Sequence, residues 1–214
     1  MATRLLLLRH GSSYHKEDKV VGPHGCRGLT PRGREEAQRL ADRLKVELGG
    51  KPSAIYSSTL PRAVETAELL AATLEVGQVL KDCGLCTWHT PDFADGMLWA
   101  EYERDYGLKG GGEYRPYEAG NESWAELIAR TGKTLEEIAA KHYGETVLIA
   151  THAETIGSSL TVFGELPLSL DFDLSITPTS ITEWVTDGNP QAFPRPRWKL
   201  SRLNDDAHLR WNLQ

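Results

Sequence analysis

Cysteine is scarce in this sequence, with three among 214 residues. An odd number gives no disulfide framework of the kind that stabilises small secreted domains, so a reducing, cytoplasmic location is expected. The spacing Cys83-x-x-Cys86-x-x-His89 is present, but the second CxxC pair of strong zinc modules is lacking. His24 or Cys26 could supply a fourth ligand. Half-buried thiols are the simpler interpretation, and neither a metal nor a cofactor is expected.

Long apolar runs are also missing. The N-terminal "MATRLLLLRH" holds four consecutive leucines before Arg9 and His10, whereas the core of a secretion signal needs about 7–15 apolar residues. No stretch approaches the roughly 20 apolar residues of a membrane span. Positive charge is not in excess either: the net charge of −6 gives no electrostatic reason to expect nucleic-acid or anionic-membrane binding. A small anionic substrate stays compatible, because a few arginines can dominate a cleft.

The composition is otherwise that of an ordinary globular protein, with 40% apolar and 25% charged residues. The length favours one domain over residues 1–214. Apolar runs alternate with amphipathic stretches, which predicts an α/β fold: a three-layer sandwich whose mostly parallel, mixed central sheet has helices on both faces. Strands are expected at 4–9, 54–57, 76–80, 146–151, 180–186 and 197–203, and helices at 31–48, 61–74, 122–142 and 154–163.

Residues 83–120 interrupt this alternation. They are rich in tryptophan and tyrosine and contain "KGGG" at 109–112, so a small inserted cap with a short helix around 97–106 is predicted. Trp88, Asp92 and Trp99 are candidates to line a substrate pocket. The alternative is that the aromatic residues form a minor core of the insert.

Four residues that can bind phosphate stand near predicted strand ends. Arg9 and His10 follow the strand at 4–9, His152 follows the strand at 146–151, and Arg62 opens the helix after the strand at 54–57. Ligands bind at the carboxyl ends of strands in such sheets, so these four side chains are expected in one crevice. The planar guanidinium group suits phosphate. A neutral imidazole can attack phosphorus. The pattern therefore indicates phosphoryl chemistry.

Five motifs, in chain order, resemble those of the histidine phosphatase superfamily, also called phosphoglycerate-mutase-like. They are "LLLRHG" at 6–11, "LTPRGREEA" at 29–37, "SSTLPRAVETA" at 57–67, "VLIATH" at 147–152 and "RLND" at 202–205, the last followed by His208 and Leu209. The resemblance implies a phosphatase that hydrolyses a small-molecule phosphomonoester through a phosphohistidine. It implies His10 as the phosphoryl acceptor and Arg9, Arg62 and His152 as the phosphate pocket.

One departure from the family pattern concerns a phosphate contact. The family usually has an asparagine six residues after its first histidine, and this chain has Lys16 there. Lysine can bind phosphate as a point charge, so Lys16 stays a candidate. Ser13, Ser57 and Thr30 are candidates for neutral contacts.

A second departure concerns the general acid. Many family members carry a proton-donating glutamate after the strand near residue 80, but this chain reads "DCGLCTWH" at 82–89. Another branch carries its donor just after the second histidine, and the spelling "HAE" at 152–154 makes Glu154 the expected donor. The alternative is that Glu154 only stabilises a helix N-terminus. Asp92, Asp95 and His89 are its rivals.

Two other functions stay open at this stage. A phosphoglycerate-mutase-type phosphomutase is disfavoured by the missing glutamate. A non-catalytic phosphate-binding scaffold of the same fold is disfavoured by the complete set of Arg9, His10, Arg62 and His152. A phosphorylated small molecule is the expected partner, without nucleic acid or membrane. The oligomeric state, a homodimer among the options, is not readable from the sequence.

Overall fold

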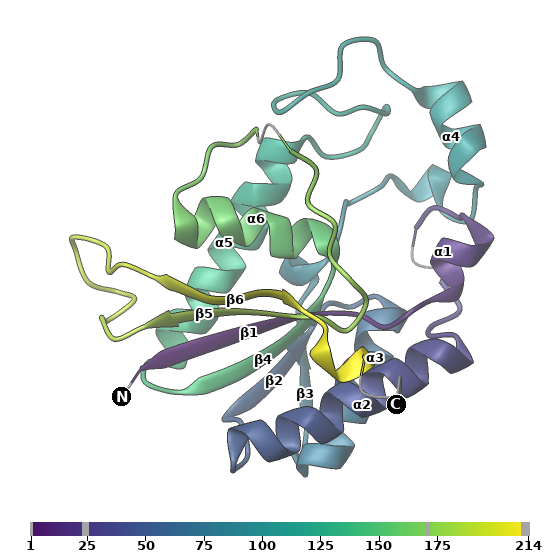
Figure 1. Cartoon of the computed structure of the whole chain (residues 1–214). Helices are drawn as coiled ribbons and strands as arrows, with labels where there is room; N and C mark the ends of the chain where they lie inside the picture. Colours follow the sequence, from purple (N-terminus) through teal and green to yellow (C-terminus); the bar gives the residue numbers. More distant parts are fainter. Residues whose placement is uncertain (1, 23–25, 170–171, 211–214) are drawn as a thin grey trace.

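The computed structural model describes residues 2–22, 26–169 and 172–210, and these contain one mixed sheet in the order β3-β2-β4-β1-β5-β6 (Figure 1). Strand β1 pairs in parallel with β4, as do β2 with β4 and with β3, whereas β5 and β6 are antiparallel additions beyond β1. The predicted α/β class and the mixed sheet are confirmed. The strands are β1 (Thr3–Arg9), β2 (Ala54–Ser57), β3 (Val79–Lys81), β4 (Thr146–Thr151), β5 (Ile181–Thr186) and β6 (Lys199–Asp205).

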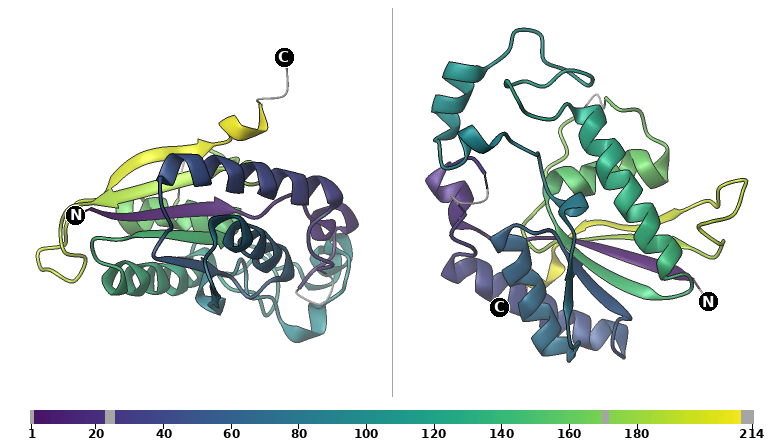
Figure 2. Two further views of the ribbon diagram at one scale, coloured as in Figure 1. Left: turned by 90° about the horizontal axis from the view of Figure 1, so that it is seen from below. Right: turned by 180° about the vertical axis from the view of Figure 1, so that it is seen from behind.

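Helices cover both faces of the sheet: α2 and α3 lie on one side and α5 and α6 on the other (Figures 1 and 2). This is the predicted three-layer arrangement. The α-helices are α1 (Tyr14–Asp18), α2 (Pro31–Leu48), α3 (Pro61–Leu74), α4 (Trp99–Tyr106), α5 (Trp124–Lys141) and α6 (Ala153–Gly164). Short 3-10 helices are η1 (Cys83–Leu85), η2 (Asp92–Ala94) and η3 (Ala207–Leu209). Helix α1 was not predicted, because it buries no residue and so has no apolar periodicity.

The leucine run of β1 explains why this strand is central. Leu5 and Leu7 belong to the core beneath α5 and α6, whereas Leu6 and Leu8 belong to the core beneath α2 and α3. All four side chains are fully buried. Successive side chains point to opposite faces, so a strand covered on both faces is continuously apolar. Burial of each leucine contributes roughly 1.5–3 kcal/mol to folding.

Helix α2 begins and ends at the residues that local chemistry dictates. The Thr30 hydroxyl accepts a hydrogen bond from the Gly33 amide at 3.1 Å, and Pro31 occupies the first turn. Gly49 ends the helix with φ 60°, in the left-handed region that glycine tolerates best. The Thr30 amide donates to the Ser12 carbonyl at 2.9 Å, which places the start of α2 beside the loop that follows β1.

A smaller unit lies away from the sheet, around α1 and α4 (Figure 1). Val21, Ala94 and Tyr102 form its own buried cluster, with Met97 packed against them. Two backbone hydrogen bonds join Val21 to the segment at 96–97, both at 2.8 Å. The unit therefore combines a segment after β1 with part of the predicted 83–120 insert.

The start of the predicted insert packs differently. Helix η1 contacts α5, and Leu85 is fully buried in the core beneath α5 and α6. Residues 83–85 are thus part of the main body, and the treatment of 83–120 as one cap stays a prediction. Among the described residues, no helix is long and apolar enough to cross a membrane.

Candidate active site

Sheet register brings the two histidines together. Arg9 is paired with Thr151 across the parallel β1–β4 ladder, and the His10 amide donates to the Thr151 carbonyl at 2.9 Å. His10 and His152 therefore leave adjacent strands at the same level, with ring centroids 5.2 Å apart. Ser58 joins them because its amide bonds to Ala150 of β4 at 3.1 Å. The expected meeting of strand ends is observed.

His10 has the geometry of a nucleophile. Its Nδ1 lies 2.8 Å from the Gly11 carbonyl oxygen, which can only accept, so Nδ1 carries the proton and Nε2 is left with a lone pair. The Nε–H of Arg62 donates to this Nε2 at 3.2 Å. Burial, with the charges of Arg62 and Arg9, holds the pKa of His10 well below its usual value. The imidazole is therefore neutral at neutral pH.

His152 is equally buried and also neutral. Its Nε2 lies 2.8 Å from the Ser58 hydroxyl. Its Nδ1 has no hydrogen-bond partner among the described residues. Burial is the main cause that lowers the pKa of His152 well below its usual value, and the positive charge of Arg62 and the nearby His10 act in the same direction. The sequence placed Ser58 at a strand end but gave no sign that it would orient His152.

Two arginines, buried Arg62 and partly buried Arg9, supply the positive charge of the site. Arg62 is only 3% exposed. Arg9 donates to the Ile176 carbonyl, while its buried Nε has no partner among the described residues. Burial lowers the pKa of Arg9, and the charge of Arg62 acts in the same direction. Buried cations are stabilised by an anion that bonds to them, and guanidinium groups fit phosphate oxygens.

These groups open onto a cavity of about 820 Å³. Two further polar atoms that line it, Ser13 Oγ and His15 Nδ1, are buried without a partner among the described residues. Burial and the charge of Arg62 lower the pKa of His15 to about 4. His15 was missed at the sequence level, since it lies in the unpredicted α1.

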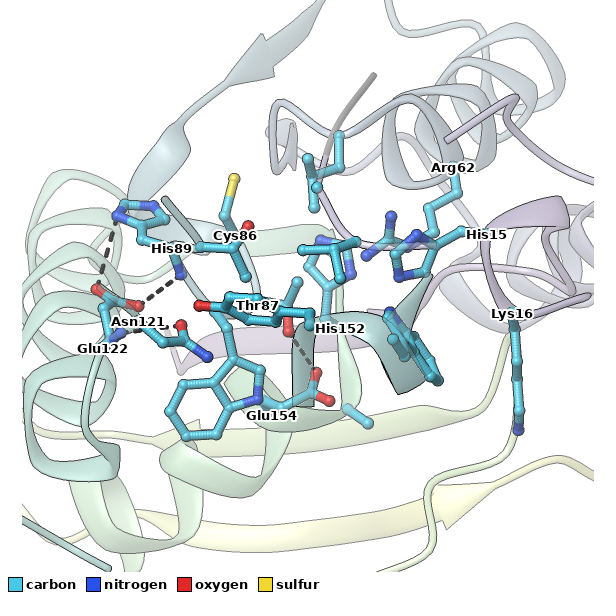
Figure 3. Close-up of a pocket in the computed structure, with 18 of the residues that line it drawn as sticks. His15, Lys16, Arg62, Cys86, Thr87, His89, Asn121, Glu122, His152 and Glu154 are labelled. Atoms are coloured by element: carbon cyan, nitrogen blue, oxygen red, sulfur yellow. Dashed lines mark hydrogen bonds and ion pairs between the residues drawn. The ribbon is translucent and has the colours of Figure 1, made fainter. Parts of the chain in front are cut away.

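All five predicted substrate-binding residues line this cavity: Ser13, Lys16, Trp88, Asp92 and Trp99. Ser13 is buried, whereas Lys16 and Asp92 are exposed. In Figure 3 the Lys16 side chain points away from His152. Trp88 packs against Trp124 at 5.8 Å between ring centroids, and Trp99 stands edge-on to His15 at 5.4 Å. Contact with substrate remains a prediction for each of them.

Thr30 and Ser57, the other candidates for neutral phosphate contacts, are not among the residues that line the cavity. Their hydroxyl groups make hydrogen bonds within the fold. Thr30 caps α2, as described above. The Ser57 hydroxyl donates to the Ser58 carbonyl at 2.7 Å.

Glu154 lies in the first turn of α6 and lines the same cavity (Figure 3). Its Oε2 accepts a hydrogen bond from the Thr87 hydroxyl at 2.9 Å. Burial lowers the pKa of Arg9, and the negative charge of Glu154 acts in the opposite direction and raises it. The Glu154 carboxylate is therefore close enough to interact electrostatically with Arg9. Thr87 belongs to the segment in which the family's usual acid was sought. Glu154 therefore reaches that part of the pocket from the carboxyl end of β4.

The rivals of Glu154 are placed differently. Asp92 is exposed at the start of η2. Asp95 packs beside Gly22 within the small unit. His89 is paired with Glu122, its Nδ1 lying 3.6 Å from a carboxylate oxygen. None of these contacts involves His10 or His152.

The three residues of the CxxCxxH spacing converge at another part of the cavity wall. The ligand atoms of Cys83, Cys86 and His89 all lie within 4.8 Å of one another. Burial raises the pKa of the Cys86 thiol. Cys26, one suggested fourth ligand, instead has its sulfur 3.4 Å from Arg62 Nη1. The other, His24, lies outside the described residues.

Comparison with known proteins gives consistent similarities. The family model described as "Histidine phosphatase superfamily (branch 1)" matches residues 5–205. The chain is 36% identical over 169 residues to "Phosphoglycerate mutase-like protein 4" of Arabidopsis thaliana, covering 72% of this chain and 68% of that protein. It is 30% identical to the "Metal-independent phosphoserine phosphatase" of the same plant, covering 70% of this chain and 64% of that protein.

Solved structures show the same fold. "Bacillus stearothermophilus YhfR" superposes with a TM-score of 0.76 at 25% identity, covering 97% of this chain and 99% of that one. A "mycobacterial glucosyl-3-phosphoglycerate phosphatase" superposes with a TM-score of 0.76 at 24% identity, covering 96% and 100%. At such low identity, the second likeness concerns the fold alone.

Proposed function

Because the chain belongs to the histidine phosphatase superfamily (branch 1), we propose that it hydrolyses a small-molecule phosphomonoester through a phosphohistidine on His10. One observation carries the proposal: His10 is neutral, has a lone pair on Nε2 and lies against buried Arg62. A neutral imidazole beside guanidinium groups is prepared to receive a phosphoryl group.

In the first half-reaction, Nε2 of His10 attacks phosphorus as the bond from phosphorus to the ester oxygen breaks. Arg62 exchanges its hydrogen bond to Nε2 for one to a phosphate oxygen. Arg9 and the free Nδ1 of His152 are the other groups for the equatorial oxygens. Their fixed positions stabilise the charge that spreads over these oxygens in the transition state.

Glu154 supplies the proton in this proposal. Its protonated carboxyl group donates to the departing alkoxide, which becomes a neutral alcohol. In the second half-reaction the carboxylate takes a proton from water as that water attacks the phosphohistidine. The P–N bond breaks, inorganic phosphate leaves and neutral His10 is restored. The Thr87 hydrogen bond orients the carboxylate for both transfers.

The substrate class proposed is a small organic phosphomonoester. The cavity of about 820 Å³ is large enough for an organic leaving group beside the phosphate. The names of the two phosphatases above mention phosphoserine and glucosyl-3-phosphoglycerate. A substrate panel should begin with these two compounds and also include sugar phosphates and nucleotides. The chemical step is proposed to be metal-independent, which is also how the name of the 30%-identical plant relative describes that protein.

Trapping tests the covalent step. A phosphatase panel identifies a substrate, which is then supplied with a radiolabelled phosphoryl group, and the reaction is stopped with denaturant during turnover. The wild-type protein should carry label on His10 and release inorganic phosphate. His10→Ala should carry none and lose at least about a thousandfold in kcat. Wild-type turnover without any labelled protein would refute the covalent route. Transfer of label into an isomer of the substrate, without phosphate release, would instead establish a mutase.

A further inference from the structure

Cys83, Cys86 and His89 form a compact set of ligand atoms that the proposed phosphatase reaction does not use. Cys83 Sγ lies 3.5 Å from Cys86 Sγ and 3.3 Å from His89 Nε2. The set lies in η1 and the loop that follows it, and all three side chains line the cavity. Two sulfurs and one imidazole nitrogen are a typical donor set for zinc.

The spacing of these atoms suits a tetrahedral zinc ion. With Zn–S bonds of about 2.3 Å and a Zn–N bond of about 2.0 Å, tetrahedral geometry separates two sulfurs by about 3.8 Å and sulfur from nitrogen by about 3.5 Å. The observed 3.5 and 3.3 Å fall within a few tenths of an ångström of these values. The third pair, the ligand atoms of Cys86 and His89, lies within 4.8 Å. Binding of the ion therefore requires side-chain rotation, which the exposed positions of Cys83 and His89 allow.

The groups around the set support metal binding. His89 turns its Nδ1 toward Glu122, at 3.6 Å (Figure 3). Its Nε2 is left 3.3 Å from Cys83 Sγ. The His89 amide also donates to Glu122 at 2.9 Å. A carboxylate behind the imidazole is the usual support of a zinc-bound histidine. The Thr59 hydroxyl lies 3.2 Å from Cys86 Sγ and can donate to its thiolate.

Arg130 fixes the loop that carries the ligands. Its guanidinium group donates to both carboxylate oxygens of Glu122, at 2.8 and 2.7 Å. It also donates at 3.0–3.3 Å to four backbone carbonyls, those of Cys83, Gly84, Cys86 and Thr87. One side chain thus orders both the CxxC turn and the carboxylate that supports His89. The site is preorganised by contacts that need no metal.

We propose that Cys83, Cys86 and His89 bind Zn²⁺, with a fourth position open to the cavity and filled by water. Three protein ligands and an exchangeable fourth position are a known zinc arrangement. The inference departs from the expectation of no metal drawn from the sequence. It concerns a separate part of the wall from His10, and the phosphoryl-transfer steps are not routed through it.

Cobalt substitution tests the site directly. The full-length protein is reduced, stripped with a chelator and titrated with Co²⁺ and with Zn²⁺ in competition with a chromophoric chelator, without any substrate. One equivalent of Co²⁺ should produce a near-ultraviolet thiolate-to-cobalt absorption band, which one equivalent of Zn²⁺ removes. Cys83→Ser and His89→Ala should weaken zinc binding at least about a hundredfold, and Glu122→Gln about 10–100-fold.

Cys26→Ser is the matched thiol control, because Cys26 lies against Arg62 and not in the cluster. It should keep the full cobalt band. The imidazoles of His10 and His152 offer only nitrogen, so metal bound there gives no thiolate band. Absence of the band in reduced protein, or its persistence in Cys83→Ser/Cys86→Ser, would overturn the proposal. So would a disulfide between Cys83 and Cys86 that resists reductant. The outcome is independent of trapping at His10.

Discussion

Burial decides the chemical state of the individual residues in this pocket. His10, Arg62 and His152 are each less than a tenth exposed, and desolvation combined with neighbouring positive charge keeps both imidazoles neutral. Neutral imidazole is the form that can attack phosphorus. The same environment favours a dianionic ligand, because an anion offsets the charge that burial makes unfavourable.

Glu154→Gln tests the proton donor at this scale. The amide keeps the shape of the side chain but cannot donate a carboxyl proton, so we expect kcat for an alkyl phosphate to fall about 100-fold or more. Hydrolysis of p-nitrophenyl phosphate should fall less than about tenfold, since its leaving group needs little protonation. Steady-state kinetics on the two substrates give the comparison. Asp92→Asn is the matched control, because it makes the same change in a rival carboxylate that also lines the cavity. An equal loss of kcat on both substrates in Glu154→Gln would argue against Glu154 as the proton donor.

At the scale of elements, the N-terminus of α2 is clamped to the loop after β1. The backbone amide and hydroxyl of Ser12 both donate to the Glu36 carboxylate, at 2.9 and 3.0 Å. The Thr30 amide donates to the Ser12 carbonyl at 2.9 Å. Gly33 permits this approach, because a Cβ there would lie 1.9 Å from the Ser12 carbonyl oxygen. The loop that carries Gly11 and supports His10 is thereby held in place.

Gly33→Ala should therefore disturb both stability and catalysis. Alanine favours an isolated helix by about 1 kcal/mol, but here its methyl group would collide with backbone, so we expect a net loss of about 1–3 kcal/mol. kcat should fall as well, because the displaced loop supports His10. Urea unfolding and steady-state kinetics measure the two effects.

Gly157→Ala in α6 is the matched control for this change. Its added Cβ would lie 3.7 Å from the Trp124 ring, an ordinary van der Waals contact. It should raise stability by about 0.5–1 kcal/mol through helix propensity alone. A stabilised Gly33→Ala protein would contradict the clamp.

At the scale of the whole molecule, charged side chains join the antiparallel edge of the sheet to α2. Arg202 on β6 pairs with Glu183 on β5 at 2.8 Å and with Glu47 on α2 at 2.7 Å. Arg43 on α2 bonds to both carboxylate oxygens of Asp205. The "RLND" signature, which helped to indicate the family, therefore acts here by attaching the last strand to a helix.

Asp205→Asn tests this attachment through pH. Arg43 lowers the pKa of Asp205 to about 2, below the value of about 3.9 in an unfolded chain. The stabilisation is therefore complete above about pH 4 and is lost as the pH falls toward 2. We expect Asp205→Asn to reduce the free energy of unfolding by about 1 kcal/mol at pH 7, after allowance for solvent screening. The difference from wild type should shrink steadily between pH 4 and pH 2.

Urea unfolding at several pH values provides the measurement. Asp206→Asn serves as control, because the ion pair that Asp206 forms within the described part of the chain is with a largely exposed Arg210. Such a pair contributes less than about 0.5 kcal/mol. A pH-independent loss for Asp205→Asn would show that its contribution is steric.

The layered α/β fold and the strand ends that carry Arg9, His10 and His152 were predictable from the amino-acid sequence. Periodicity and caps are local properties, so the bounds of α2 and α3 could be read from apolar spacing, Thr30 and the prolines. The family resemblance predicted Arg62 in the phosphate pocket, and its Nε lies 3.2 Å from His10 Nε2. It also directed attention to Glu154, because the usual acid was missing.

Which distant side chains meet depends on how the chain folds in three dimensions. Ser58 reaches His152, Thr87 reaches Glu154 and Arg130 orders the Cys83 loop through contacts between residues 43–94 positions apart. Such contacts leave no periodic signal in the chain, because they depend on strand order and register. The position of His15 in the cavity wall likewise left no signal in the sequence. For the CxxCxxH cluster, the spacing suggested three ligands, and the fold brings their ligand atoms to within 4.8 Å of one another.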